Sequence, residues 1–243
     1  MSGHSKWATI KRHKGKIDEQ RGKIFTKLGR EIFVAVREGG ANPDGNIRLR
    51  IAIQKARDAN MPMDHIQRSI AKASGELEGV NYEELFYEGY GPGGVAILVE
   101  ILTDNKKRSA ADIRFIFSRN GGSLGEAGCV NWLFDAKGLV LFDKEDPAVD
   151  EDTLTMIALE AGAEDIRDEG DSWAVVTEPG SFEAVKAAFE AQGIPMAHNE
   201  MTRLPRNTVA VAGEDAQTLA RLIELLEDND DVQNVYANAD PSE

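Results

Sequence analysis

The residues most able to do chemistry are the cations at the N-terminal end of the chain. The first sixteen residues hold five lysines and arginines, two histidines and one tryptophan, and no carboxylate. Cations bind phosphates and release counterions, and an indole stacks on an exposed base. The segment predicts contact with a nucleic-acid backbone, and the alternative is a solvated terminal tail. The residues concerned are His4, Ser5, Lys6, Trp7, Lys11, Arg12, His13, Lys14 and Lys16.

The same segment, Ser2 to Lys16, has neither helical nor strand periodicity, so we expect a mobile arm when it is free. Trp7 has two open roles there. It either stacks on a base or anchors the arm to the rest of the protein as an apolar contact.

A second set of cations follows in a helical pattern. From Asp18 to Gly39, apolar residues such as Ile24, Leu28 and Ile32 fall on one arc of a helix. The opposite arc is cationic, which extends the basic surface of the arm, although a charged helix face is often only solvated. Its members are Lys23, Lys27, Arg30 and Arg37.

A third set, Lys106, Lys107 and Arg108, stands at the expected start of a helix that Thr103 or Asp104 would cap. Cations in a first turn oppose the helix dipole, so their placement is locally unfavourable. Together with free backbone N–H groups they would hold a phosphate. Solvated lysines on a loop are the equally open alternative.

The charge of the whole chain is distributed unevenly. Its net charge is −14, but residues 1–75 carry 16 lysines and arginines against 7 carboxylates, while residues 76–243 carry 12 against 35. Such asymmetry indicates that one part binds a polyanion and the rest remains soluble. We therefore expect nucleic acid as the partner, either promoter DNA or ribosomal RNA, together with the ribosome or the transcription machinery.

Other classes of protein fit the composition poorly. The single cysteine, Cys129, excludes an internal disulfide framework, and no run of apolar residues is long enough for a membrane helix, so we expect a cytoplasmic protein without membrane contact. The sequence holds no nucleophile elbow, no zincin histidine pair and no cysteine with a nearby histidine. We expect no enzymatic activity, no catalytic residue, no metal and no cofactor.

Periodicity and turn residues predict an α+β fold. Beyond the first helix, helices are expected at Ile47–Ala59, Asp64–Ser74, Lys106–Asn120, Glu151–Ala161, Phe182–Gln192 and Asp215–Glu227. Strands are expected at Val95–Leu102, Cys129–Phe134, Leu139–Phe142, Glu164–Asp168, Trp173–Thr177, Met196–Leu204, Thr208–Ala212 and Val232–Ala237, followed by a polar tail.

The order of these elements predicts an N-terminal three-helix module and two ferredoxin-like βαββαβ domains, one inserted into the other. The first domain, residues 1–79, comprises the basic arm and the helical nucleic-acid-binding module. Residues 80–135 and 206–243 form a discontinuous α+β domain, and residues 136–205 form the acidic inserted one.

Several long motifs coincide with those of one family. The chain resembles the YebC/PmpR family, which includes a mitochondrial relative, the translational activator of cytochrome c oxidase. The motifs that carry the resemblance are GHSKWATIKRHKGKIDEQRGKIFTKLGREI, YEGYGPGGVAILVEILTDNKKR and GGSLGEAGCVNWLF. The resemblance implies the same three domains and a cytosolic protein, described in many members as a DNA-binding transcriptional regulator. It also implies roles for shared residues, none of them catalytic: His4, Ser5, Lys6, Trp7, Lys11, Arg21, Lys23 and Lys27.

Two hypotheses for the function follow. The first is control of transcription by a DNA-binding regulator that acts through its basic N-terminal module, although no helix carries a clear row of base-reading side chains. The second is a ribosome-associated translation factor that binds RNA by shape and phosphate.

Overall fold

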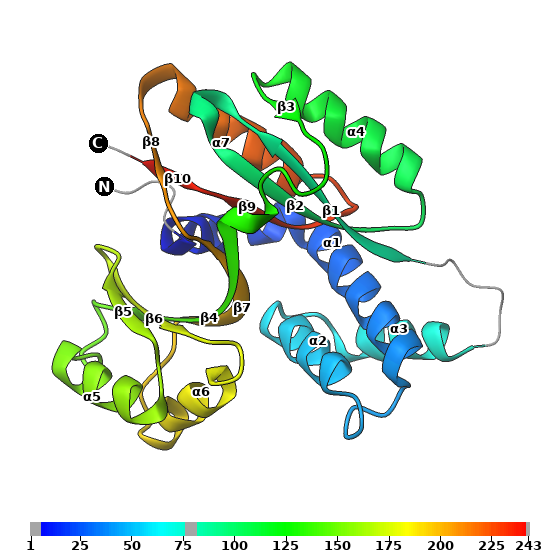
Figure 1. The fold of residues 1–243 in the computed structure, drawn as a ribbon. Coiled ribbons are helices and arrows are strands. Elements are labelled where there is room, and N and C mark those ends of the chain that lie inside the picture. The colour runs from blue at the N-terminus through cyan, green and yellow to red at the C-terminus, as the bar shows by residue number, and fades with distance from the viewer. Residues whose placement is uncertain (1–5, 76–81, 242–243) are drawn as a thin grey trace.

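The computed structural model describes residues 6–75 and 82–241, and for residues 6–20 only the backbone belongs to the described part (Figure 1). Three groups of elements are distinct in the ribbon. We call them the helical unit, the outer unit and the inserted unit, and define each below by its helices and strands.

The helical unit comprises α1 (Lys6–Gly39), α2 (Ile47–Asp58) and α3 (Met63–Ser74). α1 packs against both shorter helices, and Ile32, Leu49 and Ile66 are almost completely buried between them. The predicted positions of α2 and α3 are confirmed to within a residue at each end. This unit therefore has its own apolar core, made by one face of each helix.

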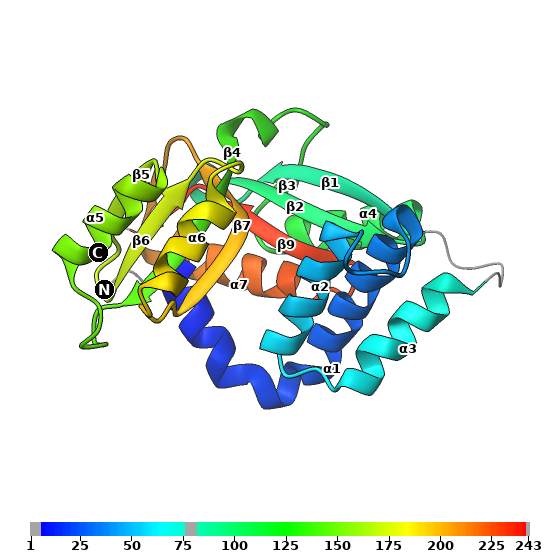
Figure 2. The same cartoon turned by 90° about the horizontal axis from the view of Figure 1, so that it is seen from below.

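The prediction of a non-helical arm is wrong from Lys6 onward, because α1 already begins there. This stretch is dominated by cations and has no apolar face with helical periodicity. Lysine, arginine, glutamine and alanine nevertheless have high intrinsic helix propensity, and an isolated glycine costs only about 1 kcal/mol. In Figure 2 the first turns of α1 bend away from the rest of the bundle, toward the inserted unit.

The outer unit is a four-stranded antiparallel sheet covered on one face by two helices. Its strands are β1 (Glu83–Tyr90), β2 (Ala96–Thr103), β3 (Ser123–Leu124) and β9 (Val232–Ala237), and its helices are α4 (Lys106–Arg119) and α7 (Gly213–Glu227). Alternate residues of β2, such as Ile97 and Val99, meet Phe117 of α4 and Leu222 of α7 in one apolar cluster. The sheet order is β3-β1-β2-β9.

This order is the ferredoxin-like one, but the strand that lies between β2 and β3 is not the predicted strand. We expected Thr208–Ala212 in this place, and β1 occupies it. β1 and β2 form a hairpin across the short helix η1 (Pro92–Gly94), and a hairpin closes at a smaller entropic cost than a strand more than a hundred residues away. The predicted strand exists as β8 (Val209–Val211), which pairs in parallel with β10 (Ala239–Pro241), within the segment expected to be a tail.

The inserted unit lies in sequence between the two halves of the outer unit. Its elements are β4 (Phe134–Asp143), α5 (Glu151–Ala161), β5 (Asp165–Asp168), β6 (Ser172–Thr177), α6 (Phe182–Ala191) and β7 (His198–Pro205). The antiparallel order β5-β6-β4-β7 is the ferredoxin-like arrangement, with Phe142, Leu154 and Phe189 in its core. The predicted α+β fold class with two ferredoxin-like units is thus confirmed. The exact domain boundaries stay a prediction.

The segment expected as a strand at Cys129–Phe134 is instead a turn that includes the short helix η2 (Asn131–Leu133). Its backbone N–H groups do not face a neighbouring strand. Those of Gly128, Val130 and Asn131 each donate to the carboxylate of Glu88, at 2.7 Å. Cys129 is therefore half-buried in a turn, against one side of an apolar cluster.

Among the described residues, none of the helices is long and apolar enough to cross a membrane.

Candidate nucleic-acid interface

The predicted contact residues fall into three groups in the structure. His4 and Ser5 lie outside the described residues. Of seven others the structure gives the helical backbone of α1 but no side chain: Lys6, Trp7, Lys11, Arg12, His13, Lys14 and Lys16. The remaining predicted residues lie on the later turns of α1 and on the first turn of α4, and their contacts can be described.

Three of the α1 cations contact the end of α7 or the loop that follows it. Lys23 forms an ion pair with Asp228, with 2.6 Å between Nζ and Oδ1, and Lys27 donates to the carbonyl of Glu227 at 2.6 Å. Arg30 donates to the carbonyl of Asp230 at 2.7 Å. The expected cationic surface at these positions is thus partly covered by the end of α7 and the loop that follows it, with Lys23 still exposed.

The end of a helix explains why these cations bind there. The last carbonyls of α7 lack intrahelical partners, and the helix dipole makes this end favourable for cations. Burial lowers the pKa of Lys27 from its ordinary value of 10.5 to about 8, although Glu227, Asp230 and Asp228 nearby favour the charged ammonium. The site therefore holds a lysine that gives up its proton far more readily than one in water.

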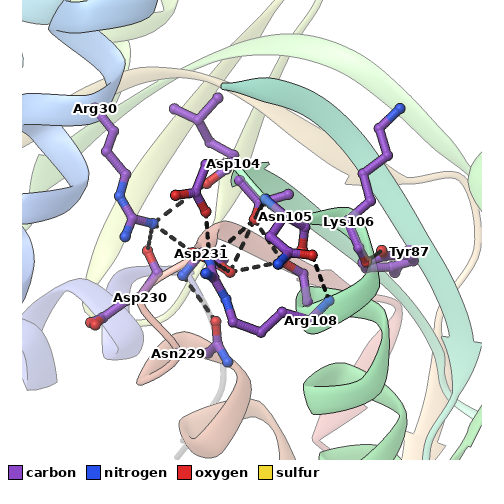
Figure 3. A network of polar contacts seen from close by, with 12 residues as sticks. Arg30, Tyr87, Asp104, Asn105, Lys106, Arg108, Asn229, Asp230 and Asp231 are labelled. Atoms are coloured by element: carbon purple, nitrogen blue, oxygen red, sulfur yellow. Dashed lines mark hydrogen bonds and ion pairs between the residues drawn. The ribbon is translucent and has the colours of Figure 1, made fainter. Parts of the chain in front are cut away.

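Asp231 is the centre of the network shown in Figure 3. Arg30 reaches it from α1 at 2.8 Å, and Arg108 and Ser109 of α4 donate to it at 2.9 and 2.7 Å. Burial raises the pKa of Asp231, but these hydrogen bonds outweigh that effect and hold the pKa below its ordinary value. This carboxylate thus joins the helical unit to the outer unit.

The first turn of α4 also differs from the expectation. Its cap is Asn105, whose side chain accepts from the N–H of Arg108 at 3.1 Å, and not Thr103 or Asp104. Lys106 is paired with Glu83 at 2.5 Å, and Arg108 with Asp104 and Asp231. These carboxylates thereby offset the unfavourable interaction of the cations with the helix dipole.

Lys107 is exposed at this turn, and Arg37 lies over the ring of Phe33, with 5.4 Å to its centroid. Other exposed cations have no carboxylate partner among the described residues and had not been predicted as contacts. They include Arg57, Arg68, Lys72, Arg114 and Arg221.

A groove between α4 and α7, of about 760 Å³, was also missed from the sequence. Phe115, which leaves 60% of its surface exposed, lines it beside Arg119, whose guanidinium lies 5.5 Å from the ring centroid. Arg221 of α7 lines the same groove. The signal in the sequence is a phenylalanine that falls off the apolar arc of its helix, between two arginines one and four residues away.

No cluster of three or more histidine, cysteine, aspartate or glutamate side chains that could hold a metal ion occurs in the part of the chain that the structure describes.

Two models of one protein family together match nearly the whole chain. Residues 5–76 match the model of the TACO1/YebC protein N-terminal domain, and residues 82–239 match that of the TACO1/YebC second and third domain. A probable transcriptional regulatory protein of Pelotomaculum thermopropionicum is 56% identical over 238 residues, 98% of either chain. One with the same name from Desulfatibacillum aliphaticivorans is 58% identical over 240 residues, 99% of this chain and 96% of its own.

A solved structure resembles the fold as well. The crystal structure of a conserved hypothetical protein from Aquifex aeolicus is 44% identical and superposes with a TM-score of 0.84, over 94% of each chain.

Proposed function

The chain belongs to the TACO1/YebC family, and we propose that it is a cytoplasmic regulator of gene expression that binds nucleic acid through its basic N-terminal part. Promoter DNA is the proposed target, since relatives more than half identical over their full length are named probable transcriptional regulatory proteins. The proposal assigns no catalytic step to the protein.

The observation that carries the proposal is the charge of the N-terminal part. Residues 1–75 hold nine more cations than carboxylates, whereas the rest of the chain is strongly acidic. Phosphate binding by cations is the main source of affinity for nucleic acid, and an acidic remainder restricts that binding to one end of the molecule. The first turns of α1, with five lysines and arginines and no carboxylate up to Lys16, are the proposed principal contact.

A second candidate target is structured RNA, as in a translation factor on the ribosome. The groove between α4 and α7 favours it, because exposed Phe115 beside Arg119 and Arg221 offers a stacking surface next to cations. Unstacked bases that stack on aromatic rings are typical of RNA loops and not of duplex DNA.

The deciding experiment identifies the nucleic acid that the protein holds in cells. The full chain is crosslinked in living cells, purified under denaturing conditions, and the attached DNA and RNA are sequenced. Discrete promoter footprints support the first target and contradict the second, and recovery dominated by ribosomal RNA does the reverse. Recovery of neither above the level of an inert acidic protein of similar size contradicts nucleic-acid binding altogether.

A further inference from the structure

The contact between the helical unit and the outer unit is mainly polar. Among the described residues beyond α3, Tyr82 is the only one in the apolar cluster of the helical unit, and Arg30 stacks over its ring at 5.6 Å. The described contacts between α1 and the end of α7 are the hydrogen bonds and ion pairs of Lys23, Lys27 and Arg30. An interface of this kind resembles a transient one and is expected to open and close.

The segment that covers these cations is unusually anionic. Residues 227–231 read Glu-Asp-Asn-Asp-Asp, four carboxylates in five positions. The three cations follow the spacing i, i+4 and i+7, so they share one face of α1. Each binds oxygen atoms. Lys27 donates to a carbonyl, whereas Lys23 and Arg30 each bind both a carboxylate and a carbonyl. Phosphate oxygens are likewise negatively charged and accept hydrogen bonds from lysine and arginine.

We propose that residues 227–231 occupy a phosphate-binding face of α1, so that nucleic acid and the docked outer unit compete for Lys23, Lys27 and Arg30. The inference rests on the proposed function and specifies how that site is regulated. The structure is then the closed form, in which the protein's own acidic segment stands in for the phosphate backbone. Full binding separates the helical unit from the end of α7.

The energies of the two partners make such competition reasonable. An exposed ion pair such as Lys23–Asp228 contributes only about 0 to 1 kcal/mol to the stability of the closed contact. Salt screens the attraction between the two charges and weakens the pair further. A nucleic-acid backbone already bound by the first turns of α1 presents its phosphates at high effective concentration to the following turns. Loosening the closed contact therefore raises the affinity for nucleic acid, by at most the factor by which it lowers the ratio of closed to open molecules.

The first test detects the closed contact directly. A water-soluble carbodiimide condenses a lysine with a carboxylate only where the two touch, and the Lys23–Asp228 amide is quantified by mass spectrometry. Saturating duplex DNA or hairpin RNA is expected to lower its yield at least about fivefold, a coupling of ordinary size. The Lys137–Glu178 pair, at 2.5 Å within the inserted unit, is the internal reference and is expected to keep its yield.

The second test weakens the acidic segment without touching buried Asp231, whose replacement would disturb the fold. Asp228→Asn with Asp230→Asn removes two exposed charges and keeps both backbone carbonyls. Affinity for the same probes is expected to rise about fivefold over a control that also loses two charges, Glu145→Gln with Glu160→Gln, both exposed on the inserted unit.

The outcomes separate the two proposals. If the wild-type protein binds neither probe, the proposed function fails, and this inference fails with it. If the probes bind but the Lys23–Asp228 yield stays unchanged, or the two double variants gain affinity equally, the proposed function stands and the competition is overturned.

Discussion

The buried carboxylate of Glu88 holds one turn of the outer unit together through three backbone hydrogen bonds. It is only 6% exposed and accepts three backbone hydrogen bonds from the turn at Gly128, Val130 and Asn131. Burial raises the pKa of Glu88, but the three N–H groups outweigh this and hold the pKa below its ordinary value. The turn they form carries the chain from β3 into β4, the first strand of the inserted unit.

Replacing this carboxylate should destabilise the protein in a pH-dependent way. Glu88→Gln turns an acceptor into an amide that donates toward an N–H group, and we expect a loss of about 2 kcal/mol at neutral pH. The folded protein binds this proton less readily than the unfolded chain, so the stabilisation is present at neutral pH and is lost as the pH falls below the ordinary carboxyl range. Urea unfolding of both proteins at neutral and acid pH measures the difference. A gap that does not narrow in acid contradicts this account.

Lys27 gives a second prediction for a single residue. Its ammonium faces Glu227, Asp228 and Asp230, with Lys23 on the same helix face, and its pKa in the closed contact is about 8. A lysine whose pKa is lowered on docking binds its proton less readily when docked. The contact with α7 should therefore strengthen as the pH rises from about 8 toward 10.5 and lose that gain as the pH falls back through 8.

Carbon-13 NMR of the lysine side chains measures this titration, with Lys27→Met to assign the signal. Asp228→Asn removes a charge that favours the ammonium, so the midpoint should move further down. A midpoint at the ordinary lysine value would mean that Lys27 is not enclosed by the end of α7 in solution.

At the scale of the elements, the turn between α1 and α2 depends on Asn46. Its side chain caps α2 by accepting from the N–H of Leu49 at 3.0 Å, and donates to the carbonyls of Ala35 and Gly40 at 2.7 and 2.8 Å. Gly39 is required beside it, because a Cβ there would lie 2.6 Å from the Asn46 amide nitrogen. One amide thus joins the end of α1 to the start of α2.

Removing this amide should destabilise the helical unit more than the loss of an ordinary helix cap would. Asn46→Ala loses the cap and the two hydrogen bonds to the carbonyls of Ala35 and Gly40, so we expect about 2 kcal/mol or more. Asn105→Ala, which removes the cap of α4 alone, is the matched control and should cost about 1 kcal/mol. Amide hydrogen exchange in α2 and α4 reports each local loss. Equal effects in the two helices would show that the additional hydrogen bonds of Asn46 contribute nothing.

At the scale of the whole molecule, charge separates the binding end from the rest. We expect that replacing Lys6, Lys11, Arg12, Lys14 and Lys16 with alanine weakens nucleic-acid binding and flattens its salt dependence. Each phosphate contact contributes about 0.9 to the slope of log affinity against log salt, so the loss of five cations should lower the slope by up to about 4.5. Titrations at several salt concentrations measure it. Arg167→Ala with Lys186→Ala, in the inserted unit, should leave the slope unchanged, and an unchanged slope in the first variant would refute the electrostatic account.

Elements whose signals are local can be predicted from the amino-acid sequence. Apolar periodicity and capping residues placed α2, α3, α5 and β9 to within about a residue, and the order of elements identified the inserted ferredoxin-like unit. It also located the excess of positive charge, because charge is additive along the chain and needs no structure to be counted. Helix formation in a highly charged stretch is equally local, but it was missed at Lys6–Lys16 because periodicity was weighed above propensity.

The contacts of each charged side chain, in contrast, depend on how distant parts of the chain fold together. The i, i+4 and i+7 spacing of Lys23, Lys27 and Arg30 is the same whether they face solvent or an acidic segment two hundred residues away. Likewise, Glu88 accepts from the N–H groups of Val130 and Asn131, which belong to a predicted strand, and β1 takes the place in the sheet that β8 was expected to fill. Such contacts depend on the folding of distant segments against one another, and no local pattern of residues encodes them.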